Sequence, residues 1–395
     1  MDRSIEIKTY HSWASLKPLI PAWEEILKEN AELSIFSTPE WLSSWWEAFG
    51  AQGHLQALGF FDKRGKLLGL IPLYEDLLYG RLPRVKALRL VGDGSGDSDN
   101  LDLILRPGNE RECCRAFVEW LTAHREWDVC CLNTMPRTST GARALLLELA
   151  ARNWPTIQTE SANAAIPLPA SWESYVAGLA GHFRPLVTRY PLRLAQRFES
   201  RVDRCEDSGQ LREALDNLFT LHQKRWNLAS EPGSFRSYER RQFYRRMAEA
   251  FLYRGWLEFW QLRLDGKVVA AQFCFRYRDT VYLLQEGFDP QFAAHKVGYA
   301  LRAEMLRRFV ETGADRYDFL GGFNTHKQNW GAQPGAYVNL CFAFPHSLGS
   351  FCMALEKCGT GSKEWLRRRV PSPVWQALHR VKVSLTTRTA ELPAA

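Results

Sequence analysis

Two pairs of apolar segments, far apart in the chain, have the pattern of β-hairpins. Leu55–Phe61 and Leu67–Tyr74 are strand-like runs on either side of a short polar turn. Leu257–Leu264 and Val268–Tyr277 flank a second turn, Asp265–Lys267, which contains an Asp-Gly pair. Apolar runs of this length around such turns are typical of antiparallel strands joined by a tight connection. The sequence therefore predicts one hairpin in each half of the chain.

The elements expected after each hairpin also correspond, as a third strand, a helix at apolar 3.6-residue spacing, and a further strand. In the first half they are 87–91 or 101–105, Glu110–His124 and Asp128–Asn133; in the second half they are Thr280–Glu286, Val297–Thr312 and Arg316–Leu320. This repeat predicts an α/β chain of mixed (α+β) sheets. We expect two tandem lobes, 1–165 and 166–346, and a C-terminal segment, 347–395.

Three further helical segments are expected between the elements of the first half and the second hairpin. They are a basic stretch, Arg189–Arg204, followed by Leu211–Asn227 and Arg240–Leu252. His222 and Arg225 lie three positions apart, so they share one face of the second helix and could face a cleft together.

Composition narrows the class of protein. The 395 residues include 51 Lys or Arg and 44 Asp or Glu, giving a formal charge of +7, with 46% hydrophobic and 24% charged residues. This balance is typical of a folded soluble chain rather than a disordered or polytopic membrane protein. The N-terminal residues lack the apolar core of a secretory signal. The nine cysteines have no zinc-type spacing, so we expect buried thiols, no metal site and a cytoplasmic protein.

The net charge is concentrated near the C-terminus. Residues 357–388 contain eight Lys or Arg against one acid, Glu364, and apolar residues alternate with these bases. A basic amphipathic segment of this kind can lie on an anionic membrane surface or dock on its own protein with its charges in water. Nucleic acid is an unlikely partner, because the remainder of the chain is neutral and has no recognisable binding motif.

Several short motifs in the second half occur in a characteristic order. They are LFTLHQKRWN, GSF, GWLEFWQLRLDGKVVAAQFCFRY, YLLQEGFDP, RYDFLGG and HKQNWGA, preceded in the first half by FSTPEWLSSWWEAFG. This succession resembles the CelD/BioF-like acetyltransferase family of the GNAT superfamily over most of residues 30–335. The resemblance implies a doubled GNAT fold, related to Fem-type aminoacyltransferases, and transfer of an acyl group from acyl-CoA to an amine.

The resemblance also indicates a donor-binding loop between a strand and a helix. The superfamily's pyrophosphate loop is typically Arg/Gln-x-x-Gly-x-Gly/Ala, and here His295, Lys296, Gly298 and Ala300 occupy the corresponding positions, with His in place of the first residue. Backbone N–H groups at a helix N-terminus bind phosphate. We therefore expect acyl-CoA as donor, with a carrier-protein thioester as the alternative. The equivalent stretch of the first lobe, 106–110, lacks the pattern and contains a proline, so we expect that lobe to be inactive.

Acyl transfer to an amine requires removal of a proton from the acceptor. Glu286, at the end of a predicted strand, is the first candidate for the general base, and His222 is the second because imidazole titrates near neutral pH. Arg225 and Trp226 belong to the same family-like motif as His222 and are expected to bind substrate.

A second group of candidates follows the predicted strand 316–320. His326 and Lys327 lie on a Gly-flanked loop suited to an anionic ligand, and these two residues and Trp330 are expected to bind substrate. Asp318 is expected to orient one of these groups. The aspartates between 93 and 102 fit no EF-hand, and we interpret them as a solvated turn.

The acceptor is left open by the sequence. An amino sugar or a lipid amine of an envelope precursor is the leading hypothesis, with ceramide-synthase-like acylation of a sphingoid base as a close variant. Fem-type transfer from aminoacyl-tRNA and a non-catalytic role in polysaccharide synthesis are the alternatives. Because of the basic segment, we expect a cytoplasmic protein that can also attach peripherally to the inner face of the membrane.

Overall fold

The computed structural model describes residues 5–78, 85–228 and 233–355 of the chain. The strands are β1 (Glu6–Tyr10), β2 (His54–Phe61), β3 (Leu67–Leu78), β4 (Val85–Leu90), β5 (Ile104–Leu105), β6 (Val129–Pro136), β7 (Thr156–Pro167), β8 (Ser200–Arg204), β9 (Leu257–Leu264), β10 (Lys267–Tyr277), β11 (Thr280–Phe288), β12 (Arg316–Gly321) and β13 (Gln333–Phe342). The α-helices are α1 (Trp13–Leu16), α2 (Ile20–Glu29), α3 (Pro39–Phe49), α4 (Glu110–Ala123), α5 (Thr140–Ala151), α6 (Trp172–Gly178), α7 (Arg184–Arg197), α8 (Ser208–Leu228), α9 (Tyr238–Tyr253), α10 (Val297–Glu311) and α11 (Thr325–Asn329). Short 3₁₀ turns occupy 17–19, 35–37, 50–52, 234–236 and 290–295.

The strands of the described residues form one sheet with the order β1-β2-β3-β4-β6-β13-β7-β12-β11-β10-β9-β8, and β5 pairs with β3. Read from its two edges, the sheet has the same plan in both halves. β2 and β3 form one antiparallel hairpin and β9 and β10 the other, as the sequence predicted. A parallel pair follows in each half, β4 with β6 and β11 with β12. The two-lobe repeat is therefore present in the fold.

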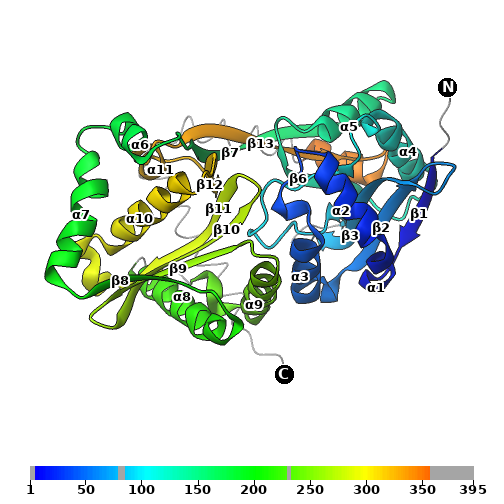
Figure 1. Cartoon of the computed structure of the whole chain (residues 1–395). Helices are drawn as coiled ribbons and strands as arrows, with labels where there is room; N and C mark the ends of the chain where they lie inside the picture. Colours follow the sequence, from blue (N-terminus) through cyan, green and yellow to red (C-terminus); the bar gives the residue numbers. More distant parts are fainter. Residues whose placement is uncertain (1–4, 79–84, 229–232, 356–395) are drawn as a thin grey trace.

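The last strand of each half lies in the other half. β7 pairs with β12, β13 pairs with β6, and β7 and β13 pair with each other along ten residue positions. Both strands run along the top of the molecule in Figure 1, where they bridge its two parts. The predicted lobe boundary at 165/166 falls inside β7, so this strand physically spans the two predicted units.

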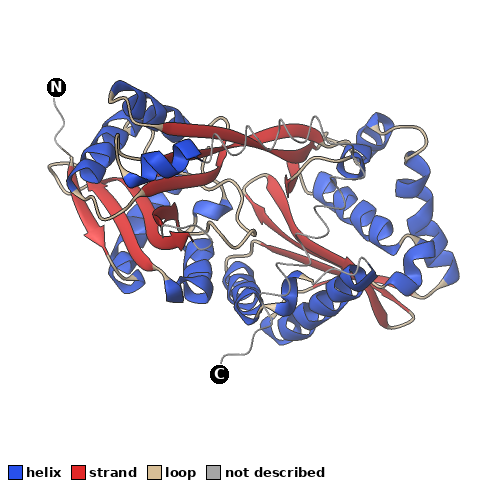
Figure 2. Cartoon of the chain, turned by 180° about the vertical axis from the view of Figure 1, so that it is seen from behind, coloured by secondary structure: helices blue, strands red, loops and turns tan. Residues whose placement is uncertain are grey.

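Helices pack on both faces of the second half of the sheet. α7 and α10 lie on one face and α8 and α9 on the other, where α9 packs against α3 of the first half. Figure 2 shows the same layers from behind. A shared aromatic core joins the halves: the ring of Trp41 on α3 packs against Phe243 and Phe251 on α9, at centroid distances of 5.1 and 6.2 Å.

One segment differs from its expected structure. The helix predicted over Arg189–Arg204 ends at Arg197, and Ser200–Arg204 is instead the edge strand β8, paired with β9. An edge strand exposes its side chains, so its arginines conceal the strand pattern in the sequence.

The eight described cysteines are free thiols, five of them buried. No helix in the described ranges is long and apolar enough to cross a membrane. The basic segment 357–388 lies outside the described residues.

Candidate functional site

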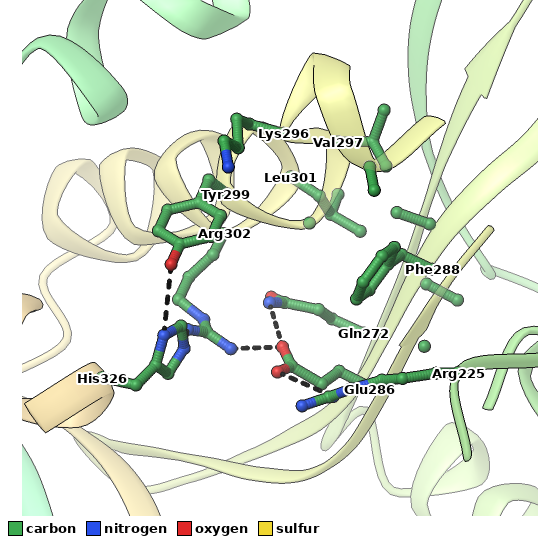
Figure 3. A pocket seen from close by; sticks show the side chains of 15 residues that line it. Arg225, Gln272, Glu286, Phe288, Lys296, Val297, Tyr299, Leu301, Arg302 and His326 are labelled. Atoms are coloured by element: carbon green, nitrogen blue, oxygen red, sulfur yellow. Dashed lines mark hydrogen bonds and ion pairs between the residues drawn. The ribbon is translucent and has the colours of Figure 1, made fainter. Parts of the chain in front are cut away.

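The parallel strands β11 and β12 pair over only three positions, Thr280 to Tyr282 against Arg316 to Asp318. Their carboxyl ends then separate. Beside the carboxyl end of β11 lies a cavity of about 220 Å³, enclosed by β10, β11 and the first turns of α10 (Figure 3). Its lining comprises Arg225, Ala270, Ala271, Gln272, Glu286, Gly287, Phe288, Ala293, Lys296, Val297, Gly298, Tyr299, Leu301, Arg302 and His326.

Strand alternation at the end of β11 sets which groups enter this cavity. Glu286 and Phe288 point toward α10, whereas Gly287 points toward α8. A Cβ atom on Gly287 would lie 2.7 Å from the backbone nitrogen of His222. The glycine therefore allows α8 to pack directly on the strand, which brings Arg225 to the cavity.

Charged groups form a network at one end of the cavity. The carboxylate of Glu286 forms an ion pair with Arg302, and Arg225 approaches its other oxygen at 3.5 Å. Nε2 of Gln272 donates to the same carboxylate at 3.2 Å. Figure 3 shows these side chains converging from β10, β11, α8 and α10. The carboxylate is thus held in one orientation from three sides.

Arg302 is the buried member of this network, with 3% of its side chain exposed. Its guanidinium lies 5.1 Å from the ring centroid of Phe319 and 5.0 Å from that of Trp330. A buried charge requires both a counter-ion and packing. Glu286 and the two rings supply them, and Trp330, fully buried, is therefore placed in the core beneath the site.

His326 connects the network to α11. Nη1 of Arg302 donates to its Nε2 at 2.7 Å, which leaves the proton of the neutral imidazole on Nδ1, 3.4 Å from the hydroxyl oxygen of Tyr299. Burial and the positive charge of Arg302 lower the pKa of His326 to about 4. The imidazole is therefore neutral at pH 7.

The charges around Glu286 make its carboxylate a weak base. Burial raises its pKa, but the guanidinium groups of Arg302 and Arg225 outweigh burial and lower the pKa to about 2. The group is ionised at every physiological pH. It is suited to holding a cation, and it binds a proton only weakly.

The predicted donor loop forms the opposite end of the cavity. Lys296 is the N-cap of α10 and has a left-handed backbone, with φ of 54°. Lys296 and Gly298, two of the residues expected to bind the donor, line the cavity next to the helix N-terminus. His295 does not line it and packs against the ring of Phe198, with centroids 5.1 Å apart; Ala300 is buried in the helix. A helix N-terminus with an adjacent lysine is a suitable environment for phosphate.

Other predicted residues lie elsewhere. His222 is buried against the ring of Phe235, at a centroid distance of 4.8 Å, and is not part of the cavity lining. Burial, followed by the charges of Arg225 and Arg240, lowers its pKa to about 4. The side chain of Trp226 lies outside the described part of the structure.

Lys327 and Asp318 are also absent from the cavity lining. The Lys327 ammonium donates to the backbone carbonyls of Phe319 and Gly322, at 3.0 and 2.8 Å. Asp318 is buried and accepts a hydrogen bond from the Leu320 N–H at 2.8 Å. Both groups therefore organise the end of β12 and the turn that follows it.

Three polar side chains of the cavity were not predicted: those of Gln272, Tyr299 and Arg302. The sequence contains a signal for Arg302, which precedes Met305 and Leu306 by three and four positions and thus lies on the apolar face of its helix. A charge on such a face requires a buried partner. Gln272 lies in a strand with a continuous apolar pattern, which gives no indication of its neighbour across the sheet.

In the first half, the turn 93–102 follows β4, and a cavity of about 470 Å³ there is lined by residues of β3, β4 and this turn, among them Arg89 and Asp93. There β4 and β6 pair only over three positions, and Asn133 beyond them donates to Asp93 at 2.8 Å. The interpretation of 93–102 as a solvated turn is wrong: Asp93, Asp97 and Asp102 are 5–8% exposed. Each has a partner, Arg89, Arg240 and Ser139 respectively, which the sequence pattern does not indicate.

Within the described ranges, no three His, Cys, Asp or Glu side chains are grouped to hold a metal ion.

Residues 186–328 match the family described as "Acetyltransferase (GNAT) domain". No curated protein matches the sequence.

Solved structures resemble the whole fold. FemX has a TM-score of 0.59 at 12% identity, covering 89% of this chain and 99% of its own. A conserved protein of unknown function from Bacteroides thetaiotaomicron gives 0.54 at 15% identity, covering 86% and 100%. The C-terminal domain of a protein assigned as a lysylphosphatidylglycerol synthetase, from Agrobacterium fabrum, gives 0.51 at 11% identity, covering 88% and 96%. At these identities, the similarity concerns the fold.

Proposed function

We propose that this chain is a GNAT-type N-acyltransferase whose acceptor is a primary amine of an envelope precursor; the match of residues 186–328 to the GNAT acetyltransferase domain family supports the reaction class. That precursor is an amino sugar or a lipid amine. The donor is an acyl-CoA, the donor implied by the domain family. The observation that carries the proposal is the cavity itself, which places Glu286 at one end and the N-terminus of α10 at the other.

The two ends suit the two substrates. Lys296 and the N-terminal amides of α10 favour the pyrophosphate of the donor. Glu286 favours the acceptor, because an ammonium group can replace the guanidinium of Arg225, which is 45% exposed and lies 3.5 Å from the carboxylate. Arg302 stays in place beneath, buried between its aromatic neighbours.

The reaction then requires few titrating groups. The amine nitrogen attacks the thioester carbonyl carbon, the C–N bond forms, the C–S bond breaks, and the sulfur leaves as the CoA thiol after taking a proton. A primary ammonium has a reference pKa near 10.4, so a carboxylate at about 2 is a poor acceptor for its proton. We assign Glu286 the binding and orientation of the acceptor, whose ammonium loses its proton to water. A general-base role of Glu286 or His222 is the alternative, and steady-state kinetics can distinguish the two.

The size of the cavity bears on the acyl group. At about 220 Å³ it is smaller than the roughly 300 Å³ at which sites for drug-sized ligands begin. This volume supports a short acyl group over a long chain, and so disfavours ceramide-synthase-like acylation.

Two observations support an acceptor at the membrane. The basic segment 357–388 is suited to an anionic lipid surface, and one protein of similar fold is assigned as a lysylphosphatidylglycerol synthetase domain, whose name indicates a lipid product. Sedimentation with anionic and neutral vesicles tests this part. Binding that is equal for both vesicle types and insensitive to salt would contradict it.

A panel of donors and acceptors tests the function directly. Purified protein is incubated with acetyl-CoA, a long-chain acyl-CoA and an aminoacyl-tRNA, each against an amino sugar, an amine-bearing lipid and a sphingoid base. We expect thiol release with the short acyl-CoA and one of the first two amines. Turnover only with aminoacyl-tRNA would support the Fem-type alternative, and no turnover with any pair would support a non-catalytic partner.

A further inference from the structure

The turn that follows β12 has an uncommon backbone. Leu320 has φ of 59° and Gly322 has φ of 82°, both in the left-handed region. For leucine this conformation costs free energy and persists only where surrounding contacts impose it. The turn leads directly into α11, which carries His326 to the cavity. Contacts that impose the turn therefore also determine where the imidazole lies.

The second half supplies part of these contacts. The ammonium of Lys327 donates to the carbonyl oxygens of Phe319 and Gly322, and the carboxylate of Asp318 accepts the Leu320 N–H. Asn324 caps α11 by accepting the N–H of Lys327 at 3.0 Å.

The remaining contacts come from the first half. Oδ2 of Asp99 accepts the Gly321 N–H at 2.8 Å, and the carbonyl oxygen of Ala162 on β7 accepts the Gly322 N–H at 2.7 Å. Asp99 lies in the turn 93–102, which follows β4 in the first half. The carboxylate therefore reaches across the molecule to a backbone group five residues before His326.

We infer that Asp99 is a positioning residue for the active site of the second half: by accepting the Gly321 N–H it fixes the turn that presents His326 to Arg302. The inference rests on the proposed function of the cavity. It gives the first lobe, expected to be inactive as a donor site, a direct part in shaping the site.

The role requires an acceptor oxygen at this position more than a negative charge. Asp99 shares its surroundings with Asp318, Asp97, Lys327 and Tyr337. The ammonium of Lys327 is already held by backbone carbonyls, so it does not depend on Asp99 as a counter-ion. Asparagine retains an acceptor oxygen of the same reach, whereas alanine removes it.

Three variants test the inference. In Asp99→Ala we expect kcat to fall roughly 10- to 100-fold, because a displacement of about 1 Å in a positioned group can cost that much. The KM for acyl-CoA should stay within about twofold, since the donor loop is untouched. Asp99→Asn should restore kcat to within about threefold of the natural protein. Asp97→Asn is the matched control: it changes a carboxylate of the same turn that contacts Arg240 and Tyr244 rather than β12, and its kcat should stay near normal.

Hydrogen–deuterium exchange over 319–330 provides a readout independent of activity. Protection there should fall in Asp99→Ala and return in Asp99→Asn. If the natural protein is active and Asp99→Ala keeps its kcat, or if Asp97→Asn loses as much, the inference is overturned while the proposed function stands. If no pair of donor and amine reacts at all, the proposed function fails. Separately, unchanged protection of 319–330 from exchange in Asp99→Ala would show that the Asp99 contact does not hold the turn, and would overturn the inference. Should Asp99→Ala fail to fold, Asp99→Glu replaces it, because the longer side chain displaces the acceptor oxygen by one methylene. A low kcat in Asp99→Glu with a normal kcat in Asp99→Asn supports the inference. A normal kcat in Asp99→Glu with a low kcat in Asp99→Asn overturns it.

Discussion

Glu286 on β11 and Arg302 on α10 form an ion pair at one end of the cavity, and each is the other's principal counter-charge. The pair joins a strand end to the middle of a helix, with the indole of Trp330 and the ring of Phe319 packed on the guanidinium. Because the arginine is buried, the carboxylate cannot be exchanged for a neutral group without consequences for both binding and stability.

Replacing Glu286 by glutamine separates acceptor binding from proton transfer. If the carboxylate holds the ammonium of the acceptor, Glu286→Gln should raise the KM for the amine about tenfold or more and change the KM for acyl-CoA little. Steady-state kinetics with each substrate varied in turn measures both constants. A fall of about 10² to 10⁴ in kcat with an unchanged amine KM would instead identify Glu286 as the general base. Normal kinetics in Glu286→Gln with a large loss in His222→Gln would transfer that role to His222.

The same pair predicts how stability depends on pH. The pKa of Glu286 is about 2 in the folded protein, below its ordinary value of 4.5, so the folded state binds fewer protons. Its contribution, on the order of 3 kcal/mol, is present above about pH 5 and is lost as the pH falls from about 4.5 toward 2. Urea denaturation of the natural protein and of Glu286→Gln should show a larger difference in unfolding free energy at pH 7 than at pH 3.5. An equal difference at both values would contradict the lowered pKa.

The donor loop contains a matched pair of basic neighbours with different surroundings. Lys296 lines the cavity, whereas His295 packs on Phe198 outside it. Lys296→Ala should therefore raise the KM for acyl-CoA several-fold with kcat nearly unchanged, because phosphate contacts act equally in the ground and transition states. His295→Ala should leave this KM within about twofold. A larger effect from His295 than from Lys296 would show that the donor takes another path.

Gly287 allows the close packing of α8 on β11. In Gly287→Ala the new Cβ would lie 2.7 Å from the His222 nitrogen and 2.9 Å from the Leu221 carbonyl carbon, and backbone atoms cannot rotate away. We expect a loss of about 1 to 3 kcal/mol in unfolding free energy. Gly298→Ala is the control, since its nearest neighbour outside the chain-adjacent atoms is a Phe288 ring carbon at 3.8 Å. Equal stability of the two variants, measured by urea denaturation, would contradict the packing argument.

Local patterns predicted the repeated elements well. The hairpins around Asp62–Lys66 and Asp265–Lys267 and the helix from Val297 are where apolar spacing and turn residues place them. The family resemblance pointed to Lys296, Gly298 and Glu286, and all three line the cavity. Their roles in binding and catalysis stay predictions.

Long-range partners could not be predicted in the same way. Nothing near Lys327 in the sequence indicates that its ammonium is taken by the carbonyls of its own turn, and nothing near Asp99 indicates Gly321. Whether His222 faces a cleft or the core depends on Phe235, which lies in a separate segment. The surroundings of these side chains depend on how distant segments pack together, and residue spacing within one segment does not indicate that packing.

The placement of β13 between β6 and β7 has a consequence for the order of events during synthesis. β6 has β13 as its second neighbour, and β13 is completed only at Phe342, long after β6 leaves the ribosome. Until then the first half has an open edge at β6 and a last strand, β7, without either of its neighbours. Open edges of this kind promote association between chains. The nascent protein can therefore complete its sheet only after β13 has been made, so neither half reaches its final strand pairing before the other half has been synthesised.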